Sequence, residues 1–273
     1  MKKNLILVIF LIIILIIIGF IFKNSNTKKG TSETEKPLIL NEGLIVADSY
    51  ETKTMNLDDP YSTFDVKYPY FKNADVSFNA NVETFVKNKM DEHVKNSADS
   101  WQARYNTQVR GDNIPKVPAT TDDKFSFISD FTIIQSNSSY ISFVLNYGGF
   151  SGGAHGYENK VSFSYDVKNK KVIELEDLFT NNPDYLTYLS EQSREILKKE
   201  FATVSEEDRK NSDPEAIKEY VDNIVSMIQE GTEPKAENFS VFTFTPEKIK
   251  IYFAQYQVGP YVIGMPTVEV DRE

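Results

Sequence analysis

Residues Tyr140–Gly156 read YISFVLNYGGFSGGAHG, a run of β-branched and aromatic side chains that ends in a cluster of glycines. The run Tyr140–Tyr147 is typical of a strand, and the glycines are typical of a turn. Similar runs flank it, and the last two are separated by a predicted hairpin turn at Lys168–Lys171. These flanking strands are Phe125–Gln135, Val161–Val167 and Val172–Leu175.

Further from this stretch, three segments show apolar side chains at three- and four-residue steps, the spacing of an amphipathic helix. The predicted helices are Asn81–Trp101, Pro183–Phe201 and Pro214–Gly231. Asn79 or Asn81 is a candidate cap for the first, and Ser212 or Asp213 for the third.

More strands are expected outside these helices, and Thr107–Asp123 reads as a loop. The expected strands are Gly43–Tyr50, Ser62–Tyr70, Phe239–Phe244, Ile249–Tyr256 and Pro266–Val270. Strands and helices cluster instead of alternating strictly, which argues against a doubly wound fold. We therefore predict an α+β fold, in which antiparallel sheets pack against a few helices after an N-terminal transmembrane helix.

The N-terminus carries the expected membrane segment. Residues Leu5–Phe22 read LILVIFLIIILIIIGFIF, in which 17 of 18 residues are apolar. At about 1.5 Å per residue a helix of this length spans roughly 27 Å, close to the hydrocarbon thickness of a bilayer. No small-x-small cleavage site follows in Lys23–Asn26, so we expect an uncleaved anchor, with a cleaved signal peptide as the alternative.

This assignment divides the N-terminal part into a cytoplasmic stub (residues 1–4), a transmembrane anchor (5–22) and a flexible polar tether (23–42). The positive charges before and after the anchor are nearly balanced, so the positive-inside rule gives little preference for either orientation. We expect a single-pass protein of the cell membrane whose C-terminal body is extracytoplasmic.

The charge is uneven. The 273 residues carry 30 Lys and Arg against 40 Asp and Glu, and the first 30 residues hold five of the lysines and no acid. Residues 31–273 therefore hold 25 basic and 40 acidic side chains, a net charge of −15. Such an acidic body is a poor nucleic-acid binder and suits soluble display or a basic partner.

Composition also limits the chemistry. The chain has no cysteine and two histidines, His93 and His155. Disulfides, thiolate zinc sites, cysteine nucleophiles and a three-histidine metal site within one chain are excluded. None of the acidic pairs has the spacing of a calcium loop. We expect no metal and no cofactor.

The stretch Gly149–Gly153 matches G-x-S-x-G, the nucleophile-elbow pattern of serine hydrolases. That elbow needs a helix after the serine, but here more glycine and another strand are expected. The only downstream histidine, His155, is four residues from Ser151 and too close to fold back as the general base. A glycine-rich turn is the favoured reading, so we expect no catalytic residue and no enzyme.

Both histidines are expected to have structural roles. We expect His155 to brace the turn by hydrogen bonding to the backbone. His93 falls beside the apolar stripe of its helix, and we expect it at the helix surface or the rim of the core.

Tyrosines near glycine or proline are candidates for a binding surface, because tyrosine offers a large contact area at a small entropic cost. Core packing is the more common role of such residues. The candidate binding residues are Tyr147, Gly149, Gly152, Gly153, His155, Tyr157, Tyr256, Pro260 and Tyr261.

Two motifs taken together resemble a known family. They are Tyr140–Gly156, followed by a hairpin and Leu175–Phe179, and the stretch Ile251–Thr267, IYFAQYQVGPYVIGMPT. They look like the extracytoplasmic domain family of unknown function at the C-terminus of the lysozyme-responsive anti-sigma factor RsiV. The segment from about Gly43 to Phe131 is similar to the domain that precedes it, which also occurs beside the catalytic domain of PdaC-type peptidoglycan deacetylases.

The resemblance implies an N-terminal α+β domain at residues 43–136 and an RsiV-like C-terminal domain at residues 137–273; whether the two regions form one domain or two stays open. It further implies a bacterial, non-enzymatic module that binds lysozyme or lies beside a wall-modifying enzyme. The sequence departs from the anti-sigma architecture because only Met1–Asn4 precedes the span. We also expect no catalytic domain within these residues.

The sequence is compatible with three functions. The favoured one is a membrane-anchored binding module for lysozyme, another basic protein or peptidoglycan, with Gly148–Tyr157 and Val258–Gly264 as its contact surface. A structural partner of a cell-wall enzyme is the alternative. A wall-acting hydrolase that uses Ser151 or a carboxylate pair is less favoured.

Overall fold

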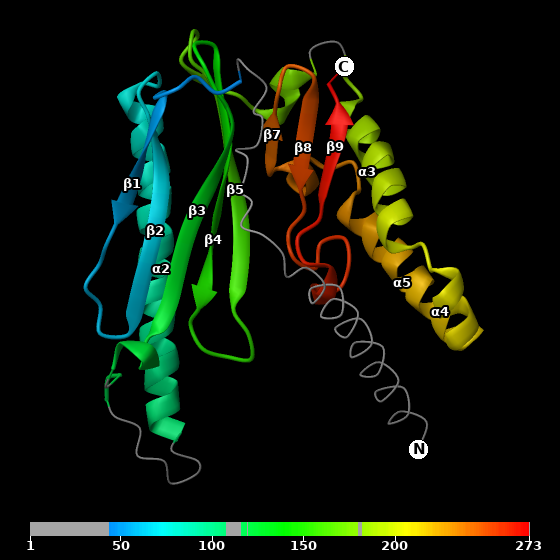
Figure 1. The fold of residues 1–273 in the computed structure, drawn as a ribbon, viewed down its shortest axis with the longest axis horizontal. Coiled ribbons are helices and arrows are strands. Elements are labelled where there is room, and N and C mark those ends of the chain that lie inside the picture. Colours follow the sequence, from blue (N-terminus) through cyan, green and yellow to red (C-terminus); the bar gives the residue numbers. More distant parts are fainter. Residues whose placement is uncertain (1–43, 108–115, 119, 180–181, 273) are drawn as a thin grey trace, which may run out of the picture. The chain divides into compact units, whose positions relative to one another are not determined.

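The computed structural model describes residues 44–107, 116–118, 120–179 and 182–272 (Figure 1). The predicted stub, anchor and tether (residues 1–42) lie outside these ranges. Within them, no helix is long and apolar enough to cross a bilayer. Residues Asn41–Glu273 form one compact unit. It contains two hydrophobic cores, so a fragment of residues 31–273 is expected to fold by itself.

The first part of the unit is a six-stranded sheet with strand order β1-β2-β3-β4-β5-β6. Its strands are β1 (Tyr50–Met55), β2 (Ser62–Phe71), β3 (Phe125–Ser136), β4 (Tyr140–Phe150), β5 (Tyr157–Asp166) and β6 (Lys171–Val172). Neighbouring strands are antiparallel except β2 and β3, which are parallel. The sheet is therefore mixed, and the expectation of purely antiparallel pairing was wrong at this pair.

The parallel pair follows from helix α2 (Val76–Thr107), which lies between β2 and β3 in the sequence and packs against β2 (Figure 1). A helical crossover returns the chain in its original direction. Buried side chains of α2 and of the strands share the first core. Asp75 accepts a hydrogen bond from the backbone N–H of Phe78 and so caps the helix. Asn79, an expected cap, is instead buried and bonds both backbone groups of Phe71.

The second part is a three-stranded antiparallel sheet that packs with helices around a second core. Its strands are β7 (Phe242–Phe244), β8 (Lys248–Tyr252) and β9 (Thr267–Asp271), and its helices are α3 (Tyr185–Phe201), α4 (Glu206–Asn211) and α5 (Pro214–Gly231). Asp213 caps α5 by accepting a hydrogen bond from Glu215 N–H, which confirms one of the two expected caps. The sequence did not predict α4.

Most predicted strands are confirmed with shifted ends, but Gly43–Tyr50 is not one. Its described part is mainly turn, with an isolated bridge from Ile45 to Ser136, and β1 starts only at Tyr50. The boundary placed between residues 136 and 137 falls in the turn between β3 and β4, which are paired neighbours in one sheet.

The two sheets meet through serine side chains. The backbone N–H of Phe244 on β7 donates to Ser142 Oγ on β4 at 3.1 Å, and Phe242 N–H donates to Ser162 Oγ on β5 at 2.9 Å. An edge strand exposes unpaired N–H groups that need acceptors when they are buried. These hydroxyls supply them, so β7 packs against the first sheet without an orphaned donor at either position.

We expect Ser142→Ala to lower the free energy of unfolding of residues 31–273 by about 2 kcal/mol. Ser142 is fully buried, and the variant leaves the N–H of Phe244 without its acceptor. Urea denaturation followed by circular dichroism measures the change. The matched control is Ser240→Ala, because Ser240 is exposed and its hydroxyl donates to the carbonyl of Glu237. This variant should change stability by less than about 0.5 kcal/mol. Equal losses in the two variants would contradict the capping role of Ser142.

Candidate functional site

The glycine-rich stretch is a strand–turn–strand connection. β4 runs to Phe150, residues 151–156 form a bend, and β5 begins at Tyr157. Gly152 and Gly153 have φ angles of +99° and +101°, which L side chains rarely adopt. Since no helix follows Ser151, the geometry differs from a nucleophile elbow.

The second candidate segment is the connection between β8 and β9. Its ends meet through a hydrogen bond from Phe253 N–H to the carbonyl of Pro266 at 2.9 Å. Pro260 precedes a short 3₁₀ helix, Tyr261–Ile263, and its carbonyl accepts from Ile263 N–H. Tyr256 has a φ of +65°, a strained conformation for a bulky residue.

The structure brings these two connections together, although about 100 residues separate them in the sequence. The rings of His155 and Tyr261 lie 4.8 Å apart, and those of Tyr256 and Tyr261 lie 5.7 Å apart. Tyr256 is 54% exposed and Tyr261 is 41% exposed. We call His155, Tyr256 and Tyr261 the aromatic patch. It presents adjacent rings to solvent, as the candidate contact surface requires.

The patch contains one local hydrogen bond and one strained backbone position. The Nδ1 atom of His155 lies 2.8 Å from the carbonyl oxygen of Gly156, the backbone contact expected for this histidine. A left-handed tyrosine costs of order 1–3 kcal/mol and persists only where the surroundings impose it. Such strain in an exposed aromatic residue is common at binding sites and motivates a functional reading of Tyr256.

Other candidate residues face helix α2 instead. Tyr147 packs edge-on against Phe85 at 5.4 Å. The Tyr157 hydroxyl lies 3.0 Å from Nδ1 of His93, and burial raises the pKa of Tyr157 to about 12. Both tyrosines are half-buried. They are therefore placed to support the base of the turn and not to extend the aromatic patch.

His93 differs from its expectation. It is 1% exposed, inside the first core, with the rings of Phe64 and Phe127 against it. The hydroxyl of Ser97 lies 3.2 Å from Nε2, so both ring nitrogens have polar partners. The predicted position at the helix surface or core rim was wrong, because hydrogen-bonding partners at both ring nitrogens offset the cost of burying the imidazole.

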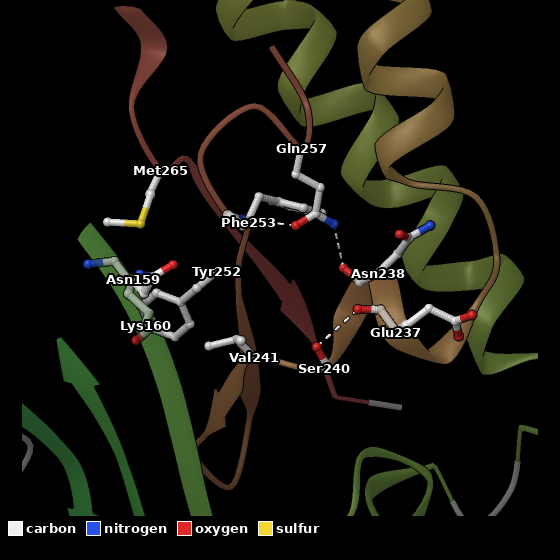
Figure 2. Close-up of a pocket in the computed structure, with 11 residues that line it drawn as sticks. Asn159, Lys160, Glu237, Asn238, Ser240, Val241, Tyr252, Phe253, Gln257 and Met265 are labelled. Atoms are coloured by element: carbon white, nitrogen blue, oxygen red, sulfur yellow. Dashed lines mark hydrogen bonds between the residues drawn. The ribbon is translucent and has the colours of Figure 1, made fainter. Parts of the chain in front are cut away.

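A small cavity lies between β5 and the second sheet. Its volume is about 170 Å³. Figure 2 shows Asn159 and Lys160 on β5 facing Tyr252 and Met265, with Gln257 bonded to Asn238 behind them. The remaining lining residues are Glu237, Ser240, Val241, Phe253 and Ala254. This cavity could not be predicted from the sequence, because residues separated by about 80 positions form its walls.

The cavity is lined by both polar and apolar residues. Lys160 Nζ lies 2.6 Å from Asn146 Oδ1 and 3.7 Å from a carboxylate oxygen of Glu158, which largely satisfies its charge. Glu237 is exposed. Across the described residues no group of three or more His, Asp or Glu side chains is placed to hold a metal.

Comparisons with known proteins identify two regions. Residues 176–273 match the family model described as a protein of unknown function (DUF3298), and residues 55–158 match the model described as deacetylase PdaC. The predicted pairing of two such domains is therefore found. Tyr140–Gly156, which we had assigned to the C-terminal family, falls within the range of the PdaC model.

One curated relative spans both regions. The chain is 25% identical over 256 residues to peptidoglycan-N-acetylmuramic acid deacetylase PdaC of Bacillus subtilis strain 168. The alignment covers 94% of this chain but 46% of the relative. The chain thus spans about half the length of that enzyme.

A solved structure supports the fold. A DUF3298 family member from Bacteroides fragilis NCTC 9343 superposes with a TM-score of 0.53 at 15% identity, covering 81% of this chain and 89% of that one. At this identity the match concerns the fold alone. It agrees with an α+β architecture of antiparallel-rich sheets and a few helices.

Proposed function

We propose that the chain is a membrane-anchored, extracytoplasmic binding module whose ligand is a cationic lysozyme. The aromatic patch carries this proposal, because it combines exposed rings from two distant connections on one surface. Tyrosine is enriched among residues that dominate binding energy. The three rings lie against one another in the absence of a partner, which lowers the entropic cost of binding.

Charge supports a basic ligand. Residues 31–273 carry a net charge of −15, and lysozymes are commonly cationic. Opposite net charges accelerate encounter, and this acceleration falls with ionic strength. The sequence motifs that resemble the RsiV family, whose domain senses lysozyme, motivate the choice of this ligand. The proposed membrane anchor at residues 5–22 would hold the module where an external lysozyme arrives.

The test is titration of residues 31–273 with a chicken-type lysozyme at low salt and again at about 0.5 M salt, where exposed charges are largely screened. We expect saturable one-to-one binding that weakens with salt but persists. Binding that is absent, or that disappears at high salt, would refute a shape-specific lysozyme module.

We expect Tyr261→Ala to weaken that binding about 30-fold, which corresponds to about 2 kcal/mol. The ring of Tyr261 contacts both other rings of the patch, so its removal divides the surface. The matched control is Tyr70→Ala on β2, because Tyr70 is 38% exposed and lies outside the patch. Calorimetric titration compares the two variants, and unchanged affinity in Tyr261→Ala would remove the patch from the interface.

Peptidoglycan is the second candidate ligand. The similarity to PdaC, whose name gives peptidoglycan as its substrate, favours it. Sugar rings stack on exposed aromatic side chains in the same way as other flat apolar surfaces. Co-sedimentation of residues 31–273 with purified cell walls, lost in Tyr261→Ala but not in Tyr70→Ala, would support this ligand over lysozyme.

A further inference from the structure

The first and second parts of the unit have separate hydrophobic cores, and no buried residue of the described chain belongs to both. In the described ranges the chain passes from one part to the other once, after β6. Compact parts joined in this way move relative to one another unless their interface is large and apolar. We call the contact of β3, β4 and β5 with β7 and the β8–β9 connection the seam.

A row of polar side chains crosses the seam. Gln135, Ser142 and Ser164 are neighbours on β3, β4 and β5, and all three are buried. Ser142 accepts a hydrogen bond from β7, so the row faces the second sheet. Apolar contacts are also present, such as that between the rings of Tyr140 and Phe244 at 5.7 Å. The seam is therefore more polar than either core.

Gln135 has an unsatisfied amide in this row. It is 1% exposed, and among the described residues neither its Nε2 nor its Oε1 has a hydrogen-bond partner. An amide buried without partners costs free energy, whereas water satisfies both atoms when the seam is open. Closure of the seam therefore carries a penalty that the two cores do not share.

The seam is also hollow between its two ends. At one end Ser162 on β5 accepts from β7, and further along β5 Lys160 and Asn159 line the cavity of about 170 Å³ (Figure 2). Beyond the start of β5, the His155 ring lies 4.8 Å from the ring of Tyr261. The aromatic patch thus forms the far end of the seam.

We propose that the two parts open and close at the seam, and that a ligand on the aromatic patch holds the seam closed. His155 belongs to the first part, whereas Tyr256 and Tyr261 belong to the second. A ligand that covers all three rings bridges the two parts and stabilises the state in which the rings are together. This closure rests on the proposed function of the patch, but the opening does not.

Hydrogen exchange of residues 31–273 without a ligand tests the opening. The amides of Phe242 and Phe244 donate to seam serines, so opening exposes them. Thr243 bonds Lys250 within the second sheet, because hydrogen-bonded pairs alternate along antiparallel strands. After correction for intrinsic rates, Phe242 and Phe244 should exchange at least about tenfold faster than Thr243. Equal protection of the three amides would overturn the opening.

Gln135→Met tests the cause, because it replaces the unsatisfied amide with an apolar side chain of similar length. Protection of Phe242 and Phe244 should rise about tenfold, since the closed seam loses its penalty. The matched control is Gln102→Met on α2, where Gln102 is exposed and bonds Asn106; it should leave this protection unchanged. Unchanged or reduced protection in Gln135→Met would mean that the amide is satisfied in the closed seam, which overturns the proposal.

A covalent bridge tests the closure without any ligand. The chain has no cysteine, so the double variant His155→Cys with Tyr261→Cys carries thiols only at the patch. Joining them with a short bis-maleimide should raise the protection of Phe242 and Phe244 at least about tenfold over the same variant with capped thiols. Unchanged protection would overturn the coupling. Failure of lysozyme to bind would refute the proposed ligand but alter none of these results, so the two proposals fail separately.

Discussion

Gly149→Ala is expected to lower the free energy of unfolding of residues 31–273 by about 3 kcal/mol or more. A Cβ atom at this position would lie 1.9 Å from the backbone oxygen of Ser126 and 3.0 Å from Cα of Phe127. Both atoms belong to the neighbouring strand β3, where Phe127 pairs with Gly149. Backbone atoms cannot yield as a side chain can, so the two central strands must separate or shift.

Urea denaturation measures this loss, and Ser151→Ala is the matched control from the same segment. Ser151 lies in the turn after β4 and is partly exposed, so its substitution should change stability by less than about 0.5 kcal/mol. A Gly149→Ala variant as stable as the control would mean that β3 and β4 can move apart cheaply. If Gly149→Ala is destabilised as expected, any loss of ligand binding in this variant reports damage to the sheet and not a lost contact.

Gly149 shows both the use and the limit of the sequence. Its neighbourhood is correctly predicted as a strand followed by a glycine-rich connection. However, the strand runs through Gly148 and Gly149 to Phe150, because these glycines permit close approach of neighbouring strands. Sequence alone assigns glycine to turns more readily than to strands, since the close neighbour, Ser126, is distant in the sequence.

The parallel pairing of β2 and β3 was missed for the same reason, namely that neighbours in the sheet are distant in the sequence. Local patterns predict each strand and the helix between them, but they contain no information on which strands become neighbours.

The candidate surface is different. Its two connections carry tyrosine, glycine and proline, and the structure places His155 against Tyr261. Tyr147 and Tyr157 satisfy the same local pattern but face α2, because side chains alternate along a strand.

His93 was misplaced because the sequence cannot show what satisfies a buried polar group. Its partners come from two elements: Ser97 lies one helical turn further along α2, and Tyr157 begins β5. Only the first is visible as a helical spacing. Together they connect the first core to the end of the glycine-rich turn, so the protonation state of His93 bears on the stability of the unit.

Between about pH 6.5 and about pH 4, His93 is expected to make folding progressively less favourable as the pH falls. Burial lowers the pKa of His93 from 6.5 to about 4, while the carboxylate of Asp59 acts weakly in the opposite direction. As the pH falls, His93 is therefore protonated near pH 6.5 in the unfolded chain but only near pH 4 in the folded chain. The stability is complete above this window, and about 3 kcal/mol is lost across it.

His93→Gln isolates this contribution, because glutamine can accept from Tyr157 and donate to Ser97 but cannot be protonated in this range. Carboxylates whose pKa values are lowered, such as Asp75 and Asp177, also make the fold less stable on acidification. They do so equally in both proteins, so their contribution cancels in the comparison. The unfolding free energy of His93→Gln, measured by urea denaturation at several pH values, should fall less steeply than that of the unmodified chain. His155→Gln, at the exposed histidine, should keep the original slope. If His93→Gln also keeps it, then the buried imidazole is protonated without penalty, and the core around it must admit water or a counter-charge on acidification.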